Sequence, residues 1–113
     1  MSSIPPIRLI KRNSRGTGLR RACSDFLATY RLRAIQGESW TSWERHPAGE
    51  ELVFLISGHV DLIQDLDGEE HRIELHAGDA VLNPPGVWHT SDVYEPGDAL
   101  FITPGQGTEH RPR

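Results

Sequence analysis

The sequence predicts an all-β fold, a barrel or sandwich of short strands. Gly and Pro are frequent, at 11 and 8 of 113 residues, which suits short strands joined by tight turns. β-favouring segments recur with turn signals between them, and no segment has the periodicity of an amphipathic helix. A small barrel of this kind removes exposed strand edges and can hold one small ligand inside.

Three strands are expected in the first half of the chain. Residues 25–35 alternate β-favouring side chains and end before Gly37. Residues 39–46 form the second expected strand, which ends at the turn Pro47-Ala48-Gly49. Residues 51–56, with the sequence ELVFLI, are mostly apolar, so we expect this strand to be buried on both faces.

A β-hairpin and three more strands are expected in the second half. Residues 60–64 and 71–75 flank Asp67-Gly68, which is a strong hairpin signal. The segment after Pro104 is rich in Gly, Arg and Pro and is expected to be coil. The further strands are expected at 80–82, 88–94 and 99–103.

The chain length of 113 residues is typical of one domain. A chain of this length can bury about two-thirds of its unfolded surface, enough for one core. We expect residues 1–22 to form an N-terminal arm with loose or edge structure, or a segment exchanged between subunits. Residues 23–104 are expected to form the barrel, and residues 105–113 the C-terminal tail.

Composition and cysteine usage exclude several classes of protein. No apolar run approaches the ~20 residues that span a bilayer, and the N-terminus lacks the apolar core of a secretory signal. Cys23 is the only cysteine, so no intrachain disulfide is possible, and we expect it to be a small buried residue. These features favour a cytoplasmic protein without membrane contact.

The charge is distributed unevenly. Residues 1–36 carry eight Lys or Arg and one acid, whereas residues 37–113 carry four Arg and fifteen acids. A basic arm is typical of nucleic-acid binding, but residues 1–22 have no aromatic residues between their charges. We therefore expect no nucleic-acid partner, and the arm is expected to pack on the acidic body of its own or a second subunit.

Two patterned segments contain the candidate site. The first is Glu44-x-His46-x4-Glu51-x6-Gly58, and the second is Gly78-x5-Pro84-x-Gly86-x2-His89. Glu44 and His46 point to the same face because side chains alternate along a strand. Glu51 begins the strand after a tight turn and can face back toward His46, and His89 follows another turn.

These side chains suit a divalent transition metal, because imidazole and carboxylate together favour such ions over calcium. His46, His89 and Glu51 alone form a facial set of two imidazoles and one carboxylate with open positions. Glu44 would complete a four-ligand site, and two carboxylates would balance the charge of a divalent ion. The open positions allow water, oxygen or substrate to bind.

The two segments resemble the paired motifs of the cupin family, G-x5-H-x-H-x3-4-E-x6-G and G-x5-P-x-G-x2-H-x3-N. The match runs from about residue 37 to residue 93. The resemblance implies a single-domain double-stranded β-helix, or jelly-roll barrel, with an N-terminal arm, like the small bacterial cupins of the RmlC-like type. It also implies that Glu44, His46, Glu51 and His89 ligate the metal. Glu51 is preferred to Glu50 because it stands at the motif's distance from Gly58.

The sequence departs from the cupin pattern at three positions. Glu44 stands where the first motif has its first His, which bears on metal identity and affinity. Gly37 is one residue out of register, and Val93 replaces the final Asn, a change that bears on packing.

The resemblance implies a homodimer, often with a shared N-terminal strand, and several chemistries. The first hypothesis is a metal-dependent enzyme that uses Fe, Mn, Ni or Zn on a small oxygenated molecule in an oxygenation, isomerisation or decarboxylation. The second is a non-enzymatic module that binds a small molecule or metal. The third is a metal-free epimerase-like or isomerase-like cupin in which His and Glu perform acid–base work.

Single residues also have simpler interpretations. His46 could lie on the surface beside Pro47, and Glu44 could pair with Arg45, be a solvated carboxylate, or serve as an acid or base beside the metal. His110, in the tail, is a weaker candidate that could fold over the barrel mouth. The remaining residues are His59, His71 and His76, expected to be exposed, and Trp40, Trp43 and Trp88, expected in the core or an interface, with Trp40 and Trp88 also candidates for a pocket wall.

Overall fold

The computed structural model describes residues 8–11, 28–35 and 39–113. Within these ranges the chain forms ten strands and no helix, which confirms the all-β prediction. The strands are β1 (Arg8–Lys11), β2 (Ala28–Ile35), β3 (Ser42–Arg45), β4 (Glu51–Leu55), β5 (His59–Leu66), β6 (Glu69–His76), β7 (Asp79–Asn83), β8 (Trp88–Glu95), β9 (Gly97–Pro104) and β10 (Glu109–Pro112).

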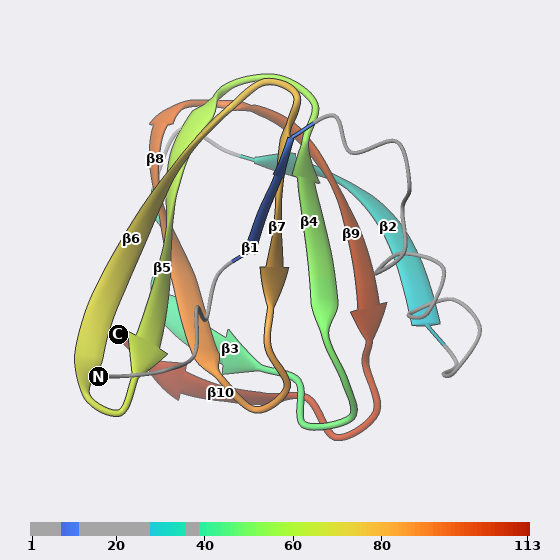
Figure 1. Ribbon diagram of the computed structural model, residues 1–113, viewed down its shortest axis with the longest axis vertical. Coiled ribbons are helices and arrows are strands. Elements are labelled where there is room, and N and C mark those ends of the chain that lie inside the picture. Colours follow the sequence, from blue (N-terminus) through green and yellow to red (C-terminus); the bar gives the residue numbers. More distant parts are fainter. Residues whose placement is uncertain (1–7, 12–27, 36–38) are drawn as a thin grey trace.

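The strands form two antiparallel sheets that face each other as a jelly roll (Figure 1). One sheet has the order β1-β7-β4-β9-β2, and the other has the order β10-β3-β8-β5-β6. Between β3 and β10 the chain passes repeatedly from one sheet to the other. Residues from both sheets therefore line the space between them.

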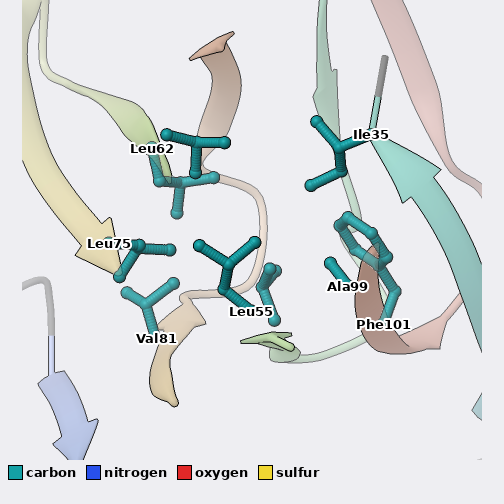
Figure 2. Close-up of a cluster of buried hydrophobic side chains, with 9 residues drawn as sticks. Ile35, Leu55, Leu62, Leu75, Val81, Ala99 and Phe101 are labelled. Atoms are coloured by element: carbon teal, nitrogen blue, oxygen red, sulfur yellow. The ribbon is translucent and has the colours of Figure 1, made fainter. Parts of the chain in front are cut away.

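The interior changes from apolar to polar along the strands. The inward positions of β5 run from Val60 and Leu62 to Gln64, and those of β4 run from Leu55 and Val53 to Glu51. Side chains two apart share a face, so each strand contributes to an apolar end and a polar end. Figure 2 shows the apolar end, where side chains from both sheets meet. The buried residues there are Ile35, Val53, Leu55, Val60, Leu62, Leu75, Val81, Ala99 and Phe101.

β4 is buried on both faces, as its apolar sequence predicts. Val53 and Leu55 belong to the interior core, whereas Leu52 packs in a second cluster on the opposite face of the same sheet. The other members of that cluster are Ala80, Leu82 and Ile102, with Phe54 and Leu100 packed against them.

The predicted hairpin is present and longer than expected. β5 and β6 pair along eight residues each, from His59 opposite His76 to Leu66 opposite Glu69. Asp67 and Gly68 have φ angles of 57° and 87°, the conformation of a type I′ turn, whose twist matches that of the strands.

Two glycines permit a close crossing of the backbone at the start of β9. A Cβ atom on Gly97 would lie 2.1 Å from the carbonyl oxygen of Ser57, and one on Gly58 would lie 2.7 Å from that of Glu95. No larger residue fits at these contacts. The last glycine of the first patterned segment, Gly58, is therefore required by packing.

The C-terminal tail was predicted to be coil, and this is wrong. Residues 109–112 form β10, which pairs with β3 at the edge of the second sheet. Strand formation in such a polar segment depends on an available partner edge more than on local propensity. At the other end, β1 pairs with β7 at the edge of the first sheet, which agrees with the expected edge structure.

Some predictions lie outside the described residues. They concern residues 25–27 of the first expected strand, Gly37 and Cys23. Among the residues that are described, no helix is long and apolar enough to cross a lipid bilayer.

Candidate metal centre

Strand pairing brings the two patterned segments together at the polar end of the barrel. Glu44 on β3 lies opposite His89 on β8, and His46 follows β3 directly. The backbone N–H of Gly86 donates to the carbonyl of His46 over 3.1 Å, which joins the two turns. Glu51, at the start of β4, reaches the same point from the other sheet.

The four predicted side chains form one compact cluster. Their ligand atoms all lie within 4.8 Å of one another. His46 Nε2 is 2.9 Å from Glu44 Oε2 and 3.2 Å from Glu51 Oε2, and His89 Nε2 is 3.4 Å from Glu51 Oε1. A six-coordinate ion with bonds of about 2.1 Å places neighbouring ligand atoms about 3.0 Å apart and opposite ones about 4.2 Å apart. The observed spacing therefore fits one transition-metal ion.

Burial differs within the cluster and indicates where it opens. His46, Glu51 and His89 are 3%, 2% and 1% exposed, whereas the side chain of Glu44 is 21% exposed. His110 on β10 lies beside it, with its Nε2 3.0 Å from Glu44 Oε1. Solvent therefore reaches the cluster at the side of Glu44, past β10.

A threonine determines which nitrogen of His46 faces the cluster. The Thr108 hydroxyl donates its proton to the carbonyl of Gly105 over 2.9 Å, so it accepts from His46 Nδ1–H over 2.8 Å. Nε2 then points toward Glu44 and Glu51. Partners of this kind orient metal-binding histidines and select their tautomer.

Glu51 is held by a chain of hydrogen bonds between the sheets. The Thr103 hydroxyl donates to Oε2 over 2.5 Å, and Asn83 Nδ2 donates to Oε1 over 3.0 Å. Gln64 Nε2 donates in turn to Asn83 Oδ1 over 2.7 Å. These bonds fix the carboxylate of Glu51 in a single orientation toward both imidazoles.

Several buried polar atoms in the cluster make no hydrogen bond within the described part of the chain. They are His46 Nε2, both ring nitrogens of His89, and Oε1 of Gln64. Buried polar atoms normally have a partner. The Nε2 atoms of His46 and His89 both lie close to carboxylate oxygens, and they are the atoms that a bound cation would satisfy.

The pKa values of the cluster are strongly perturbed. Burial disfavours the charged form of His46, but the negative carboxylates of Glu44 and Glu51, close to its Nε2, raise its pKa to about 9. Burial favours the neutral form of Glu44, but its close contact with the His46 imidazole and the attraction between their charges dominate and lower its pKa to about 2.

The pKa values of Glu51 and His89 are also set by burial and by the neighbouring charges. The pKa of Glu51 is lowered, because its bonds and charge interactions with His46 and His89 outweigh burial. Burial lowers the pKa of His89. Without metal, a proton on His46 therefore lies between two carboxylates, at the place where a cation would bind.

Two of the simpler interpretations are wrong: His46 does not lie on the surface, and Glu44 does not pair with Arg45. Arg45 forms an ion pair with Glu109 at 2.5 Å and none with Glu44. His46 is buried, and His110 does extend over the open side of the cluster. Trp40 packs against the core and Trp43 is buried, whereas Trp88 lies under Arg45 and Arg111, away from the cluster.

Sequence reasoning missed four residues that position the candidate ligands: Gln64, Asn83, Thr103 and Thr108. Alternation along the predicted strand at 60–64 places Gln64 inward with Val60 and Leu62, so the sequence contained a signal that could have identified Gln64 as an inward-facing polar residue. Thr108 had none, because it lies in a segment predicted to be coil.

Comparison with known proteins agrees with this fold. The sequence matches the family described as Cupin domain over residues 31–92, more than half of the chain. No curated protein matches the chain.

Among solved structures, that of oxalate decarboxylase from Bacillus subtilis at pH 4.6 is similar, with a TM-score of 0.63 and 17% identity over 94% of this chain. A structure from a study of the Mn(II) centres of the same enzyme gives the same TM-score and identity. The chain spans 27% of those proteins, so the likeness concerns the fold.

Proposed function

The chain belongs to the cupin domain family, and from this premise we propose that its barrel binds one divalent transition-metal ion. Glu44, His46, Glu51 and His89 would hold the ion. The observation that carries the proposal is the spacing of their ligand atoms, all within 4.8 Å and mostly about as far apart as neighbouring ligands of one ion.

The residues around the proposed ligands have distinct tasks. Thr108 keeps Nε2 of His46 directed at the ion site, and Thr103 and Asn83 orient Glu51. His46, Glu51 and His89 are almost fully buried, whereas Glu44 is partly exposed, so water would reach the ion from the side of Glu44. When bound, the ion would polarise an oxygen-bearing molecule or activate dioxygen.

The charge of the site favours particular ligands. Two carboxylates would neutralise a divalent ion, whereas the cupin pattern, with a histidine in place of Glu44, would leave one positive charge. We therefore propose a small oxygenated molecule that is neutral or carries one negative charge, reaching the ion past Glu44 and His110. A dianion such as oxalate fits this chain less well than it fits a site with three imidazoles.

Manganese is the first ion to test, because the similar solved structures include one described by its Mn(II) centres. Iron, nickel and zinc also suit imidazole and carboxylate ligands. The reaction class, whether oxygenation, isomerisation or decarboxylation, depends on which molecule occupies the open positions.

The test is metal analysis of the full chain purified without an affinity tag, followed by titration of the chelator-treated protein with Mn²⁺, Fe²⁺, Ni²⁺ and Zn²⁺. We expect one equivalent to bind in the barrel and to be lost in Glu51→Gln. Glu50→Gln, which changes the neighbouring carboxylate outside the cluster, is the matched control. A protein that takes up none of the four ions, or loses nothing in Glu51→Gln, would overturn the proposal.

A metal-free acid–base enzyme is the second candidate, and the pKa pattern favours it. His46 is protonated to about pH 9, while burial lowers the pKa of the neighbouring His89. Pairs of groups with pKa values pushed apart in this way often serve as acid and base. This candidate predicts that a small-molecule ligand binds the chelator-treated protein as tightly as the metal-loaded protein, which calorimetry of both forms decides.

A further inference from the structure

A second group of metal-binding side chains lies on the outer face of the hairpin formed by β5 and β6. Val60 and Leu75 point into the core, so their neighbours His59, Glu74 and His76 point outward. His59 and His76 are directly opposite each other in the strand register. None of these three residues belongs to the metal centre proposed in the barrel.

The ligand atoms of this outer cluster already converge. His59 Nε2 lies 2.7 Å from Glu74 Oε2, and His76 Nε2 lies 3.5 Å from the same oxygen. The two imidazoles stack with centroids 4.4 Å apart and planes inclined by 13°. One ligand atom from each side chain lies within 4.8 Å of the other two.

We propose that His59, Glu74 and His76 form a second site for a divalent transition-metal ion of the zinc class. A four-coordinate zinc ion with bonds of about 2.0–2.1 Å places its ligand atoms about 3.3 Å apart. The observed separations of 2.7 and 3.5 Å lie on either side of that value. Two imidazoles and one carboxylate are a donor set that zinc, copper and nickel prefer.

The surrounding sheet holds the outer cluster in place. A register shift between His59 and Val60 in the pairing with β8 turns His59 relative to the rest of the strand. The ring of Tyr94 lies 5.0 Å from that of His59, and its hydroxyl donates to Asp61 over 2.6 Å. Asp61 also accepts from Arg72, so this nearby carboxylate is committed to other partners.

Contacts among its own side chains satisfy the outer cluster only in part. Glu74 accepts a short hydrogen bond from His59, but its oxygen is 3.5 Å from His76 Nε2, beyond ordinary hydrogen-bond distance. A cation between the three would contact both imidazoles at once. The side chains of His59, Glu74 and His76 are 29%, 58% and 62% exposed, respectively. Water or a group from another molecule can therefore complete the coordination.

The experiment is a calorimetric titration with Zn²⁺ of the full chain, purified without a tag and treated with a chelator. We expect His76→Gln and Glu74→Gln each to bind one equivalent fewer than the unsubstituted chain. His71→Gln is the matched control, because His71 lies on the same hairpin and, in the described part of the chain, pairs with the single carboxylate of Glu69. It is expected to keep every equivalent.

The readout is a difference of one equivalent, so it does not depend on whether the barrel centre binds zinc. If the barrel fails to bind, the unsubstituted chain takes up one ion and His76→Gln takes up none. A second measurement locates the ion: Ni²⁺ should broaden the imidazole NMR signals of His59 and His76 at lower concentration than those of His71. Equal stoichiometry in the unsubstituted chain and His76→Gln, or equal broadening of all three, would refute the site.

Discussion

His46 has three polar neighbours, and together they determine its chemistry. Two carboxylates face Nε2, and the Thr108 hydroxyl accepts from Nδ1. The carboxylates favour a positive charge at Nε2, whether from a proton or a metal ion, and the threonine prevents the ring from turning over. We therefore expect the affinity of the proposed site for a metal to depend on Thr108, which is not one of the proposed ligands.

Thr108→Val keeps the shape of the side chain and removes the acceptor for His46 Nδ1–H. We expect the affinity for Mn²⁺ to fall about 10- to 100-fold, the usual effect of losing a residue that orients a metal ligand. Thr108→Ser retains the hydroxyl and is expected to restore most of the affinity. Calorimetric titration measures both, and equal affinities of Thr108→Val and the unsubstituted chain would contradict the positioning role.

Glu44 sets the charge of the proposed site and lies at its open side. Glu44→His would give the metal-loaded site one additional positive charge, so we expect oxalate to bind at least about tenfold more tightly to the Mn²⁺ form. Glu50→His adds the same residue outside the cluster and is expected to have no such effect. Calorimetry with oxalate compares the three proteins, and an unchanged affinity in Glu44→His would show that charge does not select the ligand.

β10 joins the C-terminus to the site and to the outer surface of the sheet. Two consecutive residues of β10 have different roles: His110 faces Glu44, whereas Arg111 points to the opposite side of the sheet. The Arg111 guanidinium lies 4.6 Å from the ring centroid of Trp88 and 5.3 Å from that of Trp43, and it donates to Asp65 over 2.7 Å. These contacts explain how a short polar segment is held as a strand.

Arg111→Ala removes both the stacking and the ion pair. Because the Arg111 side chain is partly exposed, we expect a loss of about 1–2 kcal/mol in the free energy of unfolding. Arg111→Lys keeps the charge without the planar group and should lose part of that amount. Urea unfolding measures the change, with His71→Ala as a surface control expected within about 0.5 kcal/mol. No loss in Arg111→Ala would mean that other contacts hold β10.

The barrel as a whole combines an apolar end that provides stability with a polar end that contains charged groups. The pKa of His46 is raised from 6.5 to about 9 in the folded, metal-free protein. A raised histidine pKa stabilises the fold fully below the unfolded value and loses that effect as pH rises through the folded value. The carboxylate of Glu44, with a pKa lowered to about 2, stabilises above about pH 4.5 and loses its effect as pH falls toward 2.

The metal-free protein is therefore expected to lose stability as pH rises from 6.5 to 9.5. Linkage puts the loss from His46 on the order of 2–3 kcal/mol. Urea unfolding of the chelator-treated protein across this range measures it. His46→Gln should lack this component of the slope, and identical slopes in the two proteins would show that His46 is not held in its protonated form.

Local patterns in the sequence were sufficient for most of the fold. The spacing of turn residues and apolar runs placed β4, the β5–β6 hairpin, β7, β8 and β9, because those choices depend on residues close together in the chain. Strand alternation and the two patterned segments also identified Glu44, His46, Glu51 and His89, which the structure brings together. Their binding of a metal, the domain limits at 22 and 104, and the homodimer stay predictions.

The tertiary structure alone decided what surrounds these residues. Thr108 meets His46 and His110 meets Glu44 across 62 and 66 residues of chain, after β10 pairs with β3. The outer cluster of His59, Glu74 and His76 differs, because the two-residue turn at Asp67-Gly68 sets the register of β5 with β6 that brings it together. The edge of β3 takes whichever partner the whole fold presents to it, so a local pattern in the sequence carries no signal for the contacts of Thr108 and His110.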